Sequence, residues 1–273
     1  MQNRPVPEDP VVLRSPAMMA FFDGVMQRQM RSTFRAVHLA RPGVPNLPSN
    51  ARVVIYSNHP SWWDPAFYIV LAKHLFSDHE SYGPMEMAAL ERYRFMRRIG
   101  IFGVQSGTRA GAARFLQVGA HILANPDRML WMTAQGQFVD PRVRPVTLRP
   151  GLAHLLRRVP GAIAVPLALE YPFWSEKRPE ALAAFGQPVV GHEHGDSLAT
   201  QLDSALERTQ DNLAKLSRLR DPSAFDCLIG GRAGVGGVYG GWLRLKTLAK
   251  GRDHQPDHAI RSTAGKHEPG DST

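Results

Sequence analysis

The stretch RVVIYSNHPSWWDP, residues 52–65, passes from an apolar run into a short polar segment and defines the first predicted strand and helix of the fold. Residues 52–57 are rich in β-branched side chains, which predicts a buried strand. Pro65 suits the first turn of a helix, because proline lacks the N–H group that is unpaired there. His59 and Asp64 therefore lie in the turn between a strand and a helix.

Strand-like and helical patterns alternate along the rest of the chain. Helices are predicted at residues 65–76, 90–98, 109–124, 152–158 and 197–219, and strands at 101–105, 129–133, 163–169 and 181–190. This alternation predicts an α/β fold, with a mixed, mostly parallel sheet flanked by helices. Such folds bind ligands at the carboxyl edge of the sheet, which is where the strand at 52–57 delivers His59.

The two ends of the chain differ in character from the predicted sheet. Residues 15–40 have apolar side chains at roughly helical spacing with arginines between them, which predicts a basic amphipathic helix. Two interpretations stay open: the helix packs on the core, or it lies in a membrane interface. We therefore expect an N-terminal segment at 1–45, a main domain at 46–220, and a glycine-rich basic extension with a disordered tail at 221–273.

Composition narrows the function classes. The 273 residues carry a formal net charge of +9, which favours polyanionic partners such as nucleic acid, an anionic membrane surface or a phosphorylated substrate. A single cysteine excludes a disulfide framework and fits a reducing compartment. The polar, proline-rich start shows no secretory signal, and no apolar run reaches the roughly 18–20 residues of a spanning helix. The histidines show no metal-ligand spacing, and no nucleic-acid-binding motif is present.

His59 and Asp64 form a candidate catalytic pair. A carboxylate against one ring nitrogen fixes the imidazole tautomer, so that the other nitrogen can take a proton from a bound hydroxyl. No serine lies in a nucleophile-elbow pattern, which favours direct attack by the substrate's own hydroxyl. The alternatives are structural: Asp64 as a helix N-cap and His59 as a buried, hydrogen-bonded core histidine.

The segment NHPSWWD, at residues 58–64, resembles the NHxSxxD signature of the glycerolipid acyltransferase family. Three later segments resemble that family's other blocks in order: GIFGVQSGTRAGAARFL from Gly100, WMTAQGQFVDPRVRPVTLRPG from Trp131, and AIAVPLALEY from Ala162. The resemblance implies a glycerol-3-phosphate acyltransferase-like fold. It also implies that His59 is the general base and Asp64 orients it, with Asn58 and Ser61 as supports.

Two blocks depart from the family pattern. Gln105 and Ser106 stand where phosphate-using members carry an acid and an arginine, and Arg109 is a candidate substitute. Gln135 precedes Gly136 where Glu-Gly is usual in the family. In this the chain resembles a bacterial lysophospholipid acyltransferase-like subgroup, which carries Gln-Gly. Candidate ligands for a substrate phosphate or carboxylate are the loop arginines Arg142, Arg144 and Arg149. A solvated basic loop near anionic lipid is the alternative.

Together these observations predict a membrane-associated O-acyltransferase. We expect acyl-CoA or acyl-carrier protein as the donor, a lipid hydroxyl as the acceptor, and neither a metal nor an organic cofactor. The protein would lie peripherally on the cytoplasmic face of the membrane. At least one of Trp62 and Trp63 is expected to pack in the core, and the alternative is that they line a mouth for the acyl chain. A non-catalytic lipid-binding protein on the same fold is the main alternative, and nucleic acid is not an expected partner.

Overall fold

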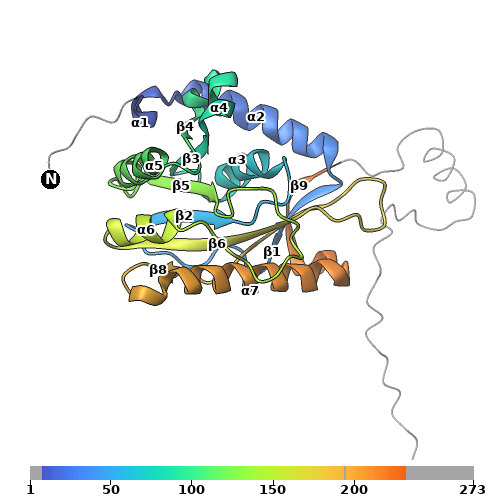
Figure 1. Ribbon diagram of the computed structural model, residues 1–273. Helices are drawn as coiled ribbons and strands as arrows, with labels where there is room; N and C mark the ends of the chain where they lie inside the picture. Colours follow the sequence, from blue (N-terminus) through green and yellow to red (C-terminus); the bar gives the residue numbers. More distant parts are fainter. Residues whose placement is uncertain (1–7, 194, 232–273) are drawn as a thin grey trace, which may run out of the picture.

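The computed structural model describes residues 8–193 and 195–231, which form one nine-stranded sheet with helices on both faces (Figure 1). The strands lie in the order β4-β3-β5-β2-β6-β7-β1-β9, and β8 pairs with β6. Five neighbouring strands are parallel to one another: β4, β3, β5, β2 and β6. Both β7 and β8 are antiparallel to β6. Strand β1 is parallel to β7, and β9 is antiparallel to β1. The predicted mixed, mostly parallel α/β sheet is therefore confirmed.

The strands span Ala36–Ala40 (β1), Arg52–Ser57 (β2), Glu80–Glu86 (β3), Ile101–Val104 (β4), Arg128–Thr133 (β5), Ala162–Glu170 (β6), Ala181–Phe185 (β7), Val189–Val190 (β8) and Phe225–Gly230 (β9). The helices span Pro10–Leu13 (α1), Pro16–Thr33 (α2), Asp64–Leu75 (α3), Met87–Arg92 (α4), Arg109–Ile122 (α5), Gly151–Arg158 (α6) and Leu198–Leu219 (α7). Short 3-10 helices cover Arg94–Ile99 (η1), Gly195–Ser197 (η2) and Pro222–Ala224 (η3).

Strand β2 is central because both of its faces are buried. Val54 and Tyr56 face a core built with α5, α6 and α7, while Val53 and Ile55 face a second core built with α2 and α3. Helix α7 accordingly lies across the sheet from α2 and α3 (Figure 1). A strand covered on both faces reads as a continuous apolar run, as residues 52–57 do. This burial fixes β2 and thereby the position of the turn that follows it.

Three expectations about the elements are corrected by the structure. The helix predicted at 15–40 runs through Gly24 but ends at Thr33, and Ala36–Ala40 is strand β1, held between β7 and β9. Strand β3 was not predicted, and the helix expected at 90–98 is divided into α4 and η1. The single strand expected at 181–190 is two strands, β7 and β8. For the strands β1, β3, β7 and β8, pairing with strands distant in sequence outweighs local spacing.

The sheet extends past both ends of the domain expected at 46–220. Strand β1 lies before it, and β9 lies after it. Residues 225–230 of the expected C-terminal extension are thus part of the sheet, whereas 232–273, which include the predicted tail, lie outside the described residues. Among the described helices, none is both long enough and apolar enough to cross a membrane.

Candidate active site

His59 and Asp64 meet at the carboxyl edge of the sheet, just after β2. The Nδ1 atom of His59 lies 2.6 Å from Oδ2 of Asp64. The Asp64 side chain is fully buried, whereas that of His59 is 17% exposed. Within residues 8–193 and 195–231, no hydrogen bond uses His59 Nε2. The predicted pair is therefore brought together, with one imidazole nitrogen held by the carboxylate and the other free for a substrate.

Three hydrogen-bond partners surround the two carboxylate oxygens of Asp64. Besides His59 Nδ1, the Ser61 backbone N–H donates to Oδ2 at 3.3 Å. The Tyr171 hydroxyl donates to Oδ1 at 2.7 Å, from the end of β6. Burial raises the pKa of Tyr171 well above its usual value, and the negative charge of Asp64 and their hydrogen bond raise it further. Tyr171 thus remains a neutral donor to Asp64.

The N-cap interpretation of Asp64 does not fit the structure. Helix α3 begins at Asp64 itself, and the cap position is Trp63, which makes no side-chain capping bond. The carboxylate points toward His59 and Tyr171 rather than to the first free N–H groups of the helix. The interpretation of His59 as a core histidine is also disfavoured, because its ring is partly exposed.

Gln135 connects the turn after β5 to the catalytic turn after β2. Its buried side-chain oxygen accepts a hydrogen bond from the His59 backbone N–H at 3.1 Å, and the Val139 N–H donates to the His59 carbonyl at 3.0 Å. Gly136, next to it, has a φ of +67°, and its N–H donates to the Thr133 carbonyl. Gln135 therefore positions the backbone of His59, and the Gly136 N–H is already used within its own turn.

Asn58 and Ser61 are placed as supports of the catalytic turn. The Asn58 side chain is fully buried, and its amide both donates to and accepts from the backbone of Leu169 on β6, at 3.0 and 2.9 Å. The Ser61 hydroxyl accepts from the Trp63 N–H at 3.2 Å. Both side chains are thus bonded to backbone groups of the protein. Their geometry favours support of the loop over substrate binding.

The aromatic side chains of the catalytic turn and of the loop after β5 differ in their surroundings. The Phe138 ring packs on the imidazole with ring centroids 4.2 Å apart and an interplanar angle of 30°, yet it remains 62% exposed. Trp62 is 75% exposed, whereas Trp63 packs against Phe34 in the core. Phe138 could not be singled out from the sequence, because a lone phenylalanine in a loop carries no pattern.

The predicted substrate-binding arginines are not equivalent. Both Nε and Nη2 of Arg142 bond the Asp140 carboxylate, at 2.9 and 2.6 Å, and these bonds lower the pKa of Asp140. Arg144 is tied to Asp211 on α7 and to two loop carbonyls. Arg109 is exposed at the first turn of α5. Arg142 and Arg144 thus already have carboxylate partners.

Arg149 differs from these arginines because it lies directly over the turn at Gly136. A Cβ atom added to Gly136 would lie 2.3 Å from Nε of Arg149. The pKa of Glu86 is lowered mainly by hydrogen bonding with Ser106. The positive charge of Arg149 lowers it further. No hydrogen bond or ion pair to another described residue engages the Arg149 guanidinium. The backbone of Arg149 is fixed by its N–H bond to the Ala134 carbonyl at 2.9 Å.

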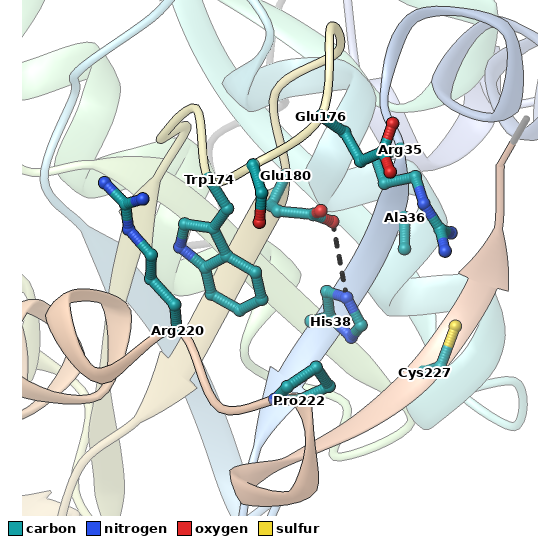
Figure 2. A pocket seen from close by; sticks show the side chains of 10 residues that line it. Arg35, Ala36, His38, Trp174, Glu176, Glu180, Arg220, Pro222 and Cys227 are labelled. Carbon is teal, nitrogen blue, oxygen red and sulfur yellow. Dashed lines mark ion pairs between the residues drawn. The ribbon is translucent and has the colours of Figure 1, made fainter. Parts of the chain in front are cut away.

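A separate cavity of about 230 Å³ lies at the same edge of the sheet, near β1 and β9 (Figure 2). Its wall includes a buried ion pair between His38 and Glu180, at 3.4 Å, and the indole of Trp174. His59 and Asp64 do not line it. Among the described residues, no group of three or more His, Cys, Asp or Glu side chains is arranged to hold a metal ion.

Neither a family model nor a curated protein matches this sequence. Among solved structures, the fold is similar to the crystal structure of the 1-acyl-sn-glycerophosphate (LPA) acyltransferase PlsC from Thermotoga maritima, with a TM-score of 0.51. The match covers 72% of this chain and 79% of that chain, at 11% sequence identity. At this identity the likeness concerns the fold alone.

Proposed function

We propose that the protein is an O-acyltransferase that moves a fatty acyl group from a thioester to a hydroxyl of a (lyso)glycerolipid or related membrane lipid. The observation that carries this proposal is the 2.6 Å contact between His59 Nδ1 and Asp64 Oδ2 at the carboxyl edge of the sheet. A buried carboxylate in this position stabilises positive charge on the ring, as a general base requires. The acyltransferase fold and the NHPSWWD segment support the same chemistry.

The proposed reaction proceeds by direct transfer. The acceptor hydroxyl donates to His59 Nε2 and attacks the carbonyl carbon of the thioester. As the new C–O bond forms, Nε2 takes the hydroxyl proton, and Asp64 stabilises the resulting imidazolium through Nδ1–H. When the C–S bond breaks, the imidazolium returns the proton to the leaving thiolate. The products are an ester and a free thiol, and Asp64 stays a carboxylate throughout.

Either acyl-CoA or acyl-carrier protein would supply the thioester, and both donors place the reaction on the cytoplasmic side of the membrane. The acceptor lipid need not carry a phosphate, because Gln105, Ser106 and Gln135 replace charged residues of the family pattern. Where an anionic group has to be bound near His59, Arg149 is the loop arginine best placed for it, since Arg142 and Arg144 are engaged by Asp140 and Asp211.

A surface formed by α2 and η1 would hold the protein on the membrane. Phe22 on α2 stacks on Phe95 of η1, with centroids 5.2 Å apart and an interplanar angle of 9°. Phe21 is 62% exposed, Phe95 is 40% exposed, and the neighbouring Arg94 side chain is 76% exposed. Exposed aromatic rings beside arginines suit the interface of an anionic bilayer.

The function is tested by comparing wild type with His59→Ala and Asp64→Asn. Each protein is offered labelled acyl-CoA or acyl-carrier protein, a panel of phosphorylated and neutral lipid acceptors, and anionic vesicles. We expect transfer by wild type and a loss of about 100-fold or more in both variants, the range of general base catalysis. Transfer that survives His59→Ala would overturn the assignment. Vesicle binding without any transfer would indicate a lipid-binding protein instead.

A further inference from the structure

Phe138 contacts the proposed base from a direction that Asp64 does not use. Asp64 approaches His59 at Nδ1, in a hydrogen bond of 2.6 Å, whereas Phe138 covers the face of the imidazole with centroids 4.2 Å apart. The angle of 30° between the ring planes makes this a tilted stack rather than an edge contact. The two neighbours thus restrict different motions of the ring: Asp64 limits rotation within its plane, and Phe138 limits tilting out of it.

The backbone holds Phe138 over His59. On one side of it, Gln135 accepts a hydrogen bond from the His59 N–H, and on the other side the Val139 N–H donates to the His59 carbonyl. Gly136 gives the turn its left-handed residue, with φ +67°. These two bonds connect the segment 135–139 to the same residue whose ring Phe138 covers. An exposed aromatic ring therefore occupies a defined place, although no core surrounds it.

We propose that Phe138 is a positioning residue for His59, which keeps the imidazole aligned and stabilises it when it takes the acceptor's proton. This inference rests on the proposed function. An aromatic face attracts a cation within about 6 Å of its centroid, so Phe138 favours the imidazolium over the neutral ring. The side chains that hydrogen-bond to His59 are the Asp64 carboxylate and the Gln135 amide, and the neutral Tyr171 hydroxyl lies beyond Asp64. Phe138 thus adds to the charge stabilisation that Asp64 provides.

The test replaces Phe138 by leucine, tyrosine and tryptophan. Leucine keeps an apolar side chain of similar bulk but has no aromatic face, whereas tyrosine and tryptophan keep the face. We expect Phe138→Leu to lower kcat by about 2- to 5-fold, the range of an exposed cation–π contact, with little change in KM for either substrate. The two aromatic variants should retain most of kcat. Val143→Ala serves as the control, since Val143 is another exposed apolar side chain of the same loop region.

A second measurement does not depend on activity. NMR of selectively labelled histidine follows the His59 ring protons, which the stacked ring of Phe138 shifts by its ring current. Phe138→Leu should remove this shift, and Phe138→Tyr should keep it. If wild type shows the shift but transfers no acyl group, the proposed function fails while the stacking stands. The positioning role is overturned if Phe138→Leu keeps full kcat, if the aromatic variants lose as much kcat as leucine, or if the ring-current shift is absent.

Discussion

The hydroxyl of Tyr171 donates a hydrogen bond of 2.7 Å to Asp64, across 107 positions of sequence. It brings the end of β6 against the start of α3 and satisfies the carboxylate oxygen that His59 does not use. An unpaired oxygen on a fully buried carboxylate would be costly. Tyr171 is therefore the partner that allows Asp64 to stay charged and buried beside the proposed base.

Tyr171→Phe should weaken both the fold and the catalysis. Removal of the hydroxyl leaves Asp64 Oδ1 without its donor, which costs about 1–3 kcal/mol for a buried group. We expect a fall of this size in the free energy of unfolding, measured by urea denaturation, together with a several-fold loss of kcat. The matched control is Tyr93→Phe, because Tyr93 is 43% exposed. A Tyr171→Phe protein as stable and as active as wild type would contradict this account of the Asp64 environment.

The burial of four tyrosine side chains should make the free energy of unfolding depend on pH in the alkaline range. Burial raises the pKa values of Tyr56, Tyr68, Tyr82 and Tyr171 above the ordinary value of about 10. These phenols keep their protons in the folded chain at a pH where the unfolded chain releases them. The free energy of unfolding is therefore insensitive to these groups below pH of about 10 and falls as pH rises further.

The measurement is a spectrophotometric titration of tyrosinate in the folded protein and in denaturant. The chain contains six tyrosines, and four of them should resist titration until the protein unfolds. A titration that superimposes on that of the denatured chain would show that these side chains are open to solvent.

The fold could be predicted from sequence where burial leaves a local pattern. Strand β2 lies at the predicted residues 52–57, and α7 agrees with the predicted helix to within one residue. Strand β3 has no such pattern, because ESYGPME contains glycine and proline. Its Gly83 is explained only by tertiary structure: an added Cβ would lie 2.9 Å from the Trp131 carbonyl oxygen.

The candidate site, likewise, could be predicted from sequence only in part. His59 and Asp64 were recognisable because they are five positions apart in one turn. Tyr171 and Phe138 come from the segments after β6 and β5, and only the parallel order of β5, β2 and β6 brings them to the same edge. The pairing of Arg142 with Asp140 and of Arg144 with Asp211 likewise depends on loop geometry that charge alone does not specify.

Gly136→Ala should be more damaging than the same change at Gly107. Both glycines have positive φ, +67° and +76°, so alanine suffers similar backbone strain at either position, of about 1–2 kcal/mol. A Cβ at Gly107 would meet no atom within 4 Å, whereas at Gly136 it would meet the Arg149 side chain at 2.3 Å. We expect Gly136→Ala to cost the same stability as Gly107→Ala but to lower activity further, since Arg149 has to move. Equal activity in both variants would show that the place of Arg149 has no consequence for the reaction.

Arg149→Gln and Arg142→Gln compare an arginine that has no carboxylate partner among the described residues with one that is paired to a carboxylate. Arg149 lies over the turn that holds His59, and no carboxylate within residues 8–193 and 195–231 engages it, whereas Arg142 bonds Asp140 with both Nε and Nη2. A charge-assisted hydrogen bond to an anion contributes about 1.5–3 kcal/mol, so losing part of it should raise KM about 5- to 30-fold. We therefore expect Arg149→Gln to raise KM for whichever substrate places a phosphate there, and Arg142→Gln to change KM less than about two-fold, as typical surface substitutions do.

Steady-state kinetics with a phosphorylated and a neutral acceptor, at varied donor concentration, identify that substrate. An increase confined to the phosphorylated acceptor assigns the phosphate to the acceptor, and an increase confined to the donor assigns it to the thioester carrier. Unchanged KM for every substrate in Arg149→Gln would remove Arg149 from the site.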